Sequence, residues 1–231
     1  MSMQCPFTHD VSATFADVVG MAGLDHAVLE SLMPRATASV DRLRKAKAAG
    51  TMPLLALPGR RDDMVAWQPI VDRYRGQFSD VVVLGIGGSS LGGATLCRLV
   101  DSGFGPANGS PSVWFLDNID PWTFDALIGR LDLGRTGFLA VSKSGGTAET
   151  LAQTLAVLDR LNQRLGTDDL ATRMTCIAEN TDNPLRAIAG HHGLLCLDHD
   201  PNIGGRYSAL SVTGLLPAAI AGVDVEAVRR G

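Results

Sequence analysis

Five short apolar runs alternate with longer segments of helical periodicity from residue 81 onward. The runs predict strands over 81–85, 113–116, 138–142, 174–178 and 194–198. The segments between them predict helices over about 90–101, 121–131, 147–165 and 183–191. Continuous apolar strands that alternate with helices indicate a parallel sheet that is covered on both faces. The predicted fold is therefore of the α/β class, an αβα sandwich around a mainly parallel five-stranded sheet.

The pattern before residue 81 is helical, and it predicts an N-terminal helical layer. Apolar positions at helical spacing predict helix within 11–47, with a second helix from about 37 to 49. Glycine and proline then interrupt the pattern. Asp62 or Asp63 is expected to cap a further helix that continues through Tyr74.

The composition indicates how large a core the chain can bury and which classes of partner it excludes. With 231 residues, 45% of them hydrophobic, the chain can bury a sizeable core. We expect a helical extension over 1–50 and one α/β domain over 51–231. The formal net charge of −4 comes without a basic stripe, which argues against nucleic acid and against an anionic membrane surface as partners.

Two turns rich in glycine, serine and threonine each follow a predicted strand and open a predicted helix, at 85–93 and 142–150. Glycines let backbone N–H groups approach an anion, hydroxyls add donors, and the helix N-terminus adds positive potential. Either turn alone could be an ordinary connection with a Ser or Thr N-cap. Because the carboxyl ends of parallel strands share one edge of the sheet, the two turns together predict a single anionic ligand.

The ligand is not expected to be a nucleotide. The chain has no G-x-x-x-x-G-K-[ST] loop, and 85–90 lacks the final Gly or Ala of G-x-G-x-x-G. No clear ribose-binding acid follows at the usual distance. The turns therefore favour a small phosphorylated molecule.

The remaining sequence features suggest a cytoplasmic protein. Four cysteines, none in a C-x-x-C pair, are interpreted as reduced and buried thiols rather than as a disulfide or metal site: Cys5, Cys97, Cys176 and Cys196. The N-terminus has no apolar signal region. The most hydrophobic tract, 209–225, is short for a membrane span and contains Gly and Pro, so we interpret it as a buried helix.

Three motifs, in this order, resemble the glucose-6-phosphate isomerase family, the phosphoglucose isomerases of the sugar-isomerase domain superfamily. They are GIGGSSLG at 85–92, SKSGGTAET at 142–150 and GGRYS at 204–208, and DNIDP at 117–121 is similar as well. The resemblance covers about residues 50–231. It implies that 51–231 form a phosphosugar-binding sugar-isomerase domain and that the family's second such domain is absent. The implied ligand is a small sugar phosphate, with no cofactor and no metal.

The resemblance also implies roles for single residues. Arg206 matches the arginine that stabilises the negative charge of a cis-enediol intermediate, as a positioned cation does. Glu149 matches the glutamate that orients the family's ring-opening histidine, and it is also a first-turn acid that suits the helix dipole. Lys143 is a further catalytic candidate, and Gly205 is a substrate-binding candidate. The implied phosphate-binding residues are Gly88, Ser89, Ser142, Ser144 and Thr147.

Interconversion of glucose 6-phosphate and fructose 6-phosphate, a step of glycolysis and gluconeogenesis, also needs a general base, which typically contributes ~10²–10⁴-fold. In the family this base is a glutamate in a later segment, and the ring-opening histidine and a lysine also lie beyond the matched region. The chain thus resembles the N-terminal half of an aldose–ketose isomerase, and we expect it to be inactive alone. Weaker candidates for a base within the chain are Glu149, Asp117, Glu179 and Asp198. Three histidines are interpreted as solvated loop residues: His191, His192 and His199.

Two other functions stay open at this point. A stand-alone phosphosugar-binding regulatory domain would keep the hydroxyl-rich turns but would not need Arg206. A structural remnant would bind no sugar phosphate. The resemblance also implies a homodimer for the full-length family enzyme.

Overall fold

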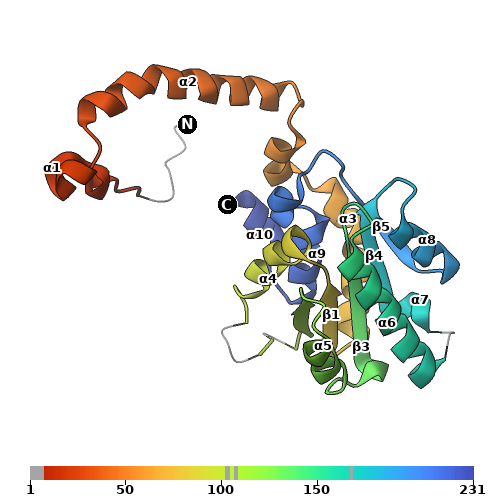
Figure 1. Ribbon diagram of the computed structural model, residues 1–231. Helices are drawn as coiled ribbons and strands as arrows, with labels where there is room; N and C mark the ends of the chain where they lie inside the picture. The colour runs from red at the N-terminus through yellow and green to blue at the C-terminus, as the bar shows by residue number, and fades with distance from the viewer. Residues whose placement is uncertain (1–7, 102–104, 107–108, 167–168) are drawn as a thin grey trace. The chain divides into compact units, whose positions relative to one another are not determined.

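The structure is a computed structural model that describes residues 8–101, 105–106, 109–166 and 169–231. Cys5 lies outside the described residues. The chain divides into two compact units, Met1–Met52 and Pro53–Gly231. Figure 1 shows the helical first unit and the α/β second unit.

The first unit is built around one long helix, α2 (His26–Ala48). The Asp25 carboxylate caps this helix by accepting a hydrogen bond from the backbone N–H of Ala27, 2.7 Å away. The helix runs through Pro34, so the expectation of a second helix that starts near residue 37 was wrong. A proline removes one backbone donor, but the alanine- and arginine-rich turns that follow favour helix and continue it. The short helices before it are η1 (Ser12–Thr14), α1 (Ala16–Val19) and η2 (Gly20–Ala22).

The second unit contains the predicted sheet. Its strands are β1 (Asp80–Leu84), β2 (Ser112–Leu116), β3 (Thr136–Val141), β4 (Met174–Glu179) and β5 (Leu195–His199). All pairings are parallel, and the strand order is β2-β1-β3-β4-β5. The five parallel strands predicted from the sequence are confirmed, each within two residues of its expected bounds.

Helices cover both faces of this sheet (Figure 1). Alternate side chains of β1 point to opposite faces, which explains why the strand is apolar from Val81 to Leu84. Val81 and Val83 join a core with α3 (Asp62–Gln77) and α9 (Val212–Ile220). Their neighbours Val82 and Leu84 join a second core on the other face. The helices that contribute to that second core are α5 (Pro121–Ile128), α6 (Ala148–Leu165), α7 (Leu170–Arg173) and α8 (Pro184–His191).

The hydrophobic tract at 209–225 forms the buried helix that the sequence suggested. Every residue of α9 is buried, and α4 (Leu91–Cys97) packs against it. A turn after α9 leads into the last helix, α10 (Val225–Arg230). The remaining short helices are η3 (Pro53–Gly59), η4 (Gly87–Ser89), η5 (Leu133–Arg135) and η6 (Gly205–Leu210).

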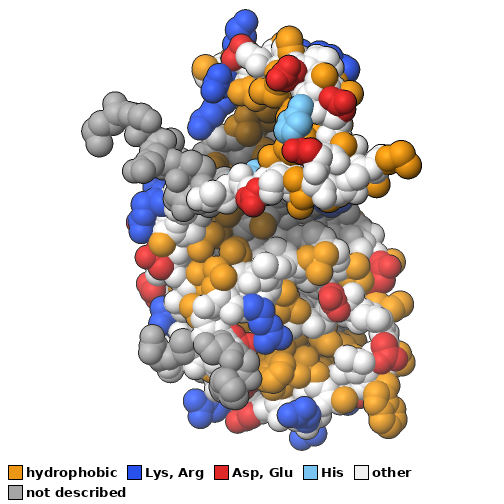
Figure 2. Space-filling model, turned by 90° about the vertical axis from the view of Figure 1, so that its left-hand side faces the viewer, with side chains coloured by type: hydrophobic (Ala, Val, Ile, Leu, Met, Phe, Trp, Pro, Cys, Tyr) orange, Lys and Arg blue, Asp and Glu red, His pale blue; other side chains and the backbone are white. Residues whose placement is uncertain are grey.

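The surface carries both signs of charge. Figure 2 shows Lys and Arg side chains interspersed with Asp and Glu and with apolar side chains on the face that it displays. None of the described helices combines the length and the apolar character that a membrane crossing requires.

Candidate functional site

The two glycine-rich turns meet at the carboxyl edge of the sheet. They follow β1 and β3, which are neighbours, with Leu84 paired to Ala140. The contact is close, because a Cβ atom built on Gly85 would lie 3.0 Å from the carbonyl oxygen of Val141. The strands on either side of β1 are reached by opposite crossovers, so this is the position at which open α/β sheets bind ligands.

Hydroxyl groups and one constrained glycine shape the turn after β3. The buried Ser142 hydroxyl donates a hydrogen bond to the hydroxyl of Thr147, 3.0 Å away. Gly145 has a φ of +64°, and a Cβ atom there would lie 1.9 Å from Oδ1 of Asn183. Asn183 in turn caps α8 by accepting from the N–H of Arg186. Only glycine fits the backbone at this point of the turn.

The same turn ends at the N-terminus of α6. Thr147 is the N-cap residue, but its hydroxyl makes no capping bond and interacts with Ser142 instead. Ser144, which is exposed, accepts a hydrogen bond from the N–H of Gly146 at 3.3 Å. The first N–H groups of a helix have no partners within it and carry the positive end of its dipole. An oxyanion at this edge would therefore meet backbone donors and hydroxyls together.

The turn after β1 packs directly against the segment that contains Arg206. A Cβ atom built on Gly88 would lie 2.2 Å from the carbonyl oxygen of Gly205 and 3.2 Å from the backbone nitrogen of Arg206. No side chain fits into that space. Ser89, the next residue, is half-buried at the end of η4.

A serine joins the arginine segment to the first turn. The buried Ser208 hydroxyl lies 3.0 Å from the carbonyl oxygen of Gly88 and 2.6 Å from that of Gly205, and it donates toward both. Arg206 itself is exposed, as is Tyr207 beside it. The structure thus brings Gly88, Gly205 and the backbone of Arg206 together.

Lys143 extends toward the strands on the other side of β3. Its ammonium group donates to the carbonyl oxygen of Pro201 at 2.9 Å and pairs with the carboxylate of Glu179 at 3.4 Å. The ammonium group thus links β3 to the ends of β4 and β5. Glu179, one of the candidates for an in-chain base, is held in this ion pair.

His199 lies at the same edge and is buried, so its interpretation as a solvated loop histidine was wrong. It is the last residue of β5, paired with Glu179 of β4. Burial lowers the pKa of the imidazole from its usual value of 6.5, because the charged form loses solvation. Its Nδ1 lies 2.8 Å from the carbonyl oxygen of Asp200. Apolar flanks in the sequence, Leu195 and Leu197, were the available signal for a strand that reaches this residue.

The other acidic candidates occupy different environments. Glu149 is half-buried in the first turn of α6. Asp117 is exposed after β2. Asp198 pairs with Arg186 and accepts from the side-chain amide of Asn180. Within the described residues, no three side chains among His, Cys, Asp and Glu cluster closely enough to hold a metal ion.

The cysteines of the described residues are free thiols. Cys97 and Cys176 are buried, and burial raises the pKa of each thiol to about 12. Cys196 is half-buried and lies opposite Cys176 on the neighbouring strand, and burial raises the pKa of its thiol as well.

The family model and the sequence relatives that match this chain point to the same protein family. Residues 68–227 match the family model described as phosphoglucose isomerase. The glucose-6-phosphate isomerase of Rubrobacter xylanophilus is 35% identical over 213 residues, which are 90% of this chain and 48% of that protein. The enzyme of the same name from Thermus thermophilus is 37% identical over 191 residues, 77% of this chain and 44% of that protein.

Solved structures agree with these sequence matches. A hypothetical protein from Thermus thermophilus superposes with a TM-score of 0.72 at 34% identity, over 88% of this chain and 48% of that one. A glucose-6-phosphate isomerase from Chlamydia trachomatis superposes with a TM-score of 0.59 at 25% identity, over 69% of this chain and 29% of that one. The chain spans about half the length of the curated relatives it matches. On its sequence and its fold, the chain belongs to the phosphoglucose isomerase family.

Proposed function

We propose that the chain binds the phosphate group of a sugar phosphate between the turns after β1 and β3, and presents Arg206 to the sugar. The observation that carries the proposal is the contact between the first turn and η6, in which Ser208 reaches Gly88 and Gly205. This contact holds the backbone of Arg206 against the first turn. Hydroxyls and a helix N-terminus of the kind found in the two turns suit a phosphate, and this supports the proposal. The ligand class is glucose 6-phosphate and fructose 6-phosphate, the pair interconverted by the family.

The roles of the residues follow from their chemistry. Ser142, Ser144, Thr147 and Ser89 supply hydroxyl groups, and charge-assisted hydrogen bonds contribute about 1.5–3 kcal/mol each. Arg206 stabilises the negative charge that develops as a proton moves between C1 and C2 of the open sugar. Glu149 would orient a histidine that protonates the ring oxygen.

We further propose that this chain alone does not turn over sugar phosphate. Isomerisation needs a carboxylate or imidazole poised to take a proton from carbon. Glu179 is paired with Lys143, and Asp198 is paired with Arg186. The buried His199 is paired with Glu179 across β4 and β5, next to the Lys143–Glu179 ion pair. The base would then come from the part of the relatives that this chain does not span.

The proposal is tested by calorimetric titration of the 231-residue chain with fructose 6-phosphate, together with an isomerisation assay. We expect saturable binding, weaker binding by Arg206→Ala, and no turnover. Arg130→Ala is the matched control, because Arg130 is an exposed arginine just after α5. It should bind like the parent chain.

Three results would contradict this proposal in whole or in part. No binding by a folded chain would refute the proposed function. Binding that ignores Arg206→Ala would favour a phosphosugar-binding regulator instead. Turnover that disappears in Arg206→Ala would place a base within the chain, with Glu149 as the first candidate to replace.

A further inference from the structure

The guanidinium group of Arg229, on α10, is the most completely buried charge that the structure describes. Its side chain is 0% exposed, and all five N–H donors of the group are used. Two of them form a bidentate pair with the Asp63 carboxylate, at 2.7 and 2.6 Å. A buried cation is costly unless every donor is satisfied, and here each one has an acceptor.

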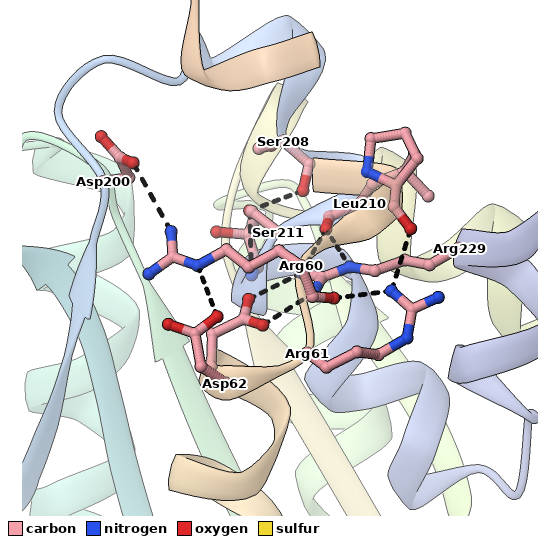
Figure 3. A network of polar contacts seen from close by, with 11 residues as sticks. Arg60, Arg61, Asp62, Asp200, Ser208, Leu210, Ser211 and Arg229 are labelled. Atoms are coloured by element: carbon pink, nitrogen blue, oxygen red, sulfur yellow. Dashed lines mark hydrogen bonds and ion pairs between the residues drawn. The ribbon is translucent and has the colours of Figure 1, made fainter. Parts of the chain in front are cut away.

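The three acceptors come from segments that are distant in sequence. Asp63 lies in the first turn of α3, and the carbonyl oxygen of Arg60, just before that helix, accepts at 2.7 Å. The carbonyl oxygen of Leu210 accepts twice, from Nη2 at 2.7 Å and from Nε at 3.1 Å. Figure 3 shows Arg229 reaching between Arg60 and Leu210. Arg229 therefore ties the end of η6 to the start of α3.

Leu210 closes the short segment that contains Arg206. Ser208, within the same segment, donates to the carbonyl oxygen of Gly88 in the first turn and to that of Gly205 at the start of η6. Between Ser208 and α9, the Ser211 hydroxyl donates to the carbonyl oxygen of Ser208 at 2.7 Å (Figure 3). The segment that carries Arg206 is thus fastened at two points, to the first turn through Ser208 and to Arg229 through Leu210.

We propose that Arg229 is a positioning residue for Arg206. It acts through the Leu210 carbonyl and does not touch the ligand. The inference rests on the proposed function, because it assumes that Arg206 faces the sugar end of a bound sugar phosphate. A lysine would keep the charge at position 229, but its single ammonium group cannot reproduce a planar fork that serves Asp63 and Leu210 together.

The test uses the 231-residue chain and four variants. Arg229→Lys keeps the charge, and Arg229→Met removes it. Asp63→Leu combined with Arg229→Met removes the buried pair as a whole, so that no charge is left unpaired if Arg229→Met alone fails to fold. Arg230→Lys is the matched control, since this neighbouring arginine is exposed and forms surface ion pairs with Glu226 of α10 and with Asp224, the N-cap residue of that helix.

Two probes separate the ends of the site. Inorganic phosphate reports on the hydroxyl-rich turns alone. The second probe, 6-phosphogluconate, carries a carboxylate at C1, where isomerisation would build negative charge near Arg206. We expect Arg229→Lys to weaken 6-phosphogluconate binding by about tenfold or more, the scale of one lost charged hydrogen bond, and to leave phosphate affinity within about twofold. Arg230→Lys should leave both affinities unchanged.

A double-mutant cycle distinguishes positioning from general destabilisation. In the Arg206→Ala background, Arg229→Lys should have almost no further effect on 6-phosphogluconate binding, because the two residues act as a unit. A loss that persists in this background, or one that affects phosphate equally, overturns the proposal. So does wild-type affinity in both Arg229→Lys and the Asp63→Leu/Arg229→Met variant.

Amide hydrogen exchange gives a readout that needs no ligand. In Arg229→Lys, the amides of η6 and Ser211 should exchange at least about tenfold faster, while those of β3 keep their rate, because local opening need not affect the sheet. Unchanged protection of η6 overturns the proposal. If neither probe binds the parent chain, the proposed function fails, and the exchange result still decides whether Arg229 fastens η6.

Discussion

The Ser208 hydroxyl hydrogen-bonds to the carbonyl oxygen of Gly88, 3.0 Å away, although 120 residues separate the two in sequence. This contact makes the first glycine-rich turn and the Arg206 segment a single structural unit. A change on either side should therefore affect both stability and ligand binding.

Gly88→Ala is expected to destabilise the protein. The new Cβ atom would lie 2.2 Å from the carbonyl oxygen of Gly205, and overpacking of this kind costs about 1–3 kcal/mol. The free energy of unfolding, measured by urea denaturation, should fall by that amount, and fructose 6-phosphate should bind more weakly. Gly76→Ala in α3 is the control. Its Cβ atom would have no described atom within 4 Å, and the change should stabilise the helix by about 0.5–1 kcal/mol. Equal effects of the two changes would contradict the packing described here.

Gly145→Ala should cost more than the same change at Gly193. Both glycines have left-handed backbones, with φ values of +64° and +66°. A Cβ atom on Gly193 would have no described atom within 4 Å, so the conformational cost of about 1–2 kcal/mol is the one expected there. At Gly145 the Cβ atom would also collide with Asn183, which must then give up its cap on α8. Thermal unfolding of the two variants measures the difference, and a smaller loss at Gly145 would be inconsistent with this contact.

Ser142→Ala should weaken the binding of fructose 6-phosphate while the fold survives. The Ser142 hydroxyl lies in the turn between β3 and α6, and among the described residues its one side-chain partner is Thr147. Loss of one hydrogen bond to a charged phosphate corresponds to about 1.5–3 kcal/mol, or roughly ten- to a hundredfold in affinity. Ser112→Ala, at the start of β2 and the opposite edge of the sheet, is the control for calorimetric titration. Parent-like affinity in Ser142→Ala would remove this hydroxyl from the proposed site.

His199 should make the protein less stable as the pH falls below about 6.5. Burial lowers the pKa of His199 in the folded state, so the unfolded chain binds more protons in this range and stability rises with pH. The full contribution of the neutral His199 to the free energy of unfolding is present above its unfolded-state pKa of 6.5. This contribution is lost as the pH falls below that value. Urea midpoints between about pH 7.5 and 5.5 measure this slope. His199→Gln should flatten it relative to the exposed-residue control His191→Gln, and an unaltered slope in His199→Gln would rule out this histidine as the cause.

The strands were predictable because each carries its own signal. A strand buried on both faces reads as a continuous apolar run, and residues 81–84 of β1 and 138–141 of β3 show this in the sequence alone. The long helix α2 was predicted less well, because Pro34 suggests a break that the surrounding helix-favouring residues override. The interpretation of His199 as a solvated residue was wrong because its burial depends on the neighbouring strand β4 and not on its own segment.

The composition of the two turns likewise follows from local chemistry. Glycine at a left-handed backbone and hydroxyls at a helix N-terminus are requirements that a few consecutive residues reveal. The partners of these residues are not local. Lys143 donates to the carbonyl oxygen of Pro201, and Arg229 donates to that of Leu210. These bonds, and the contact of Gly88 with Gly205, cannot be predicted from the residues next to them in sequence.

By itself, the sequence determined the parallel sheet, the identity of the turns and the family, because hydrophobic periodicity and short motifs are encoded within single elements. Only the tertiary structure decided that Arg229 is buried and that Glu179 pairs with Lys143. A charged side chain near the end of a chain looks like a surface residue until the acceptors around it are known. Those acceptors come from segments that meet only when β-strands and helices have packed together.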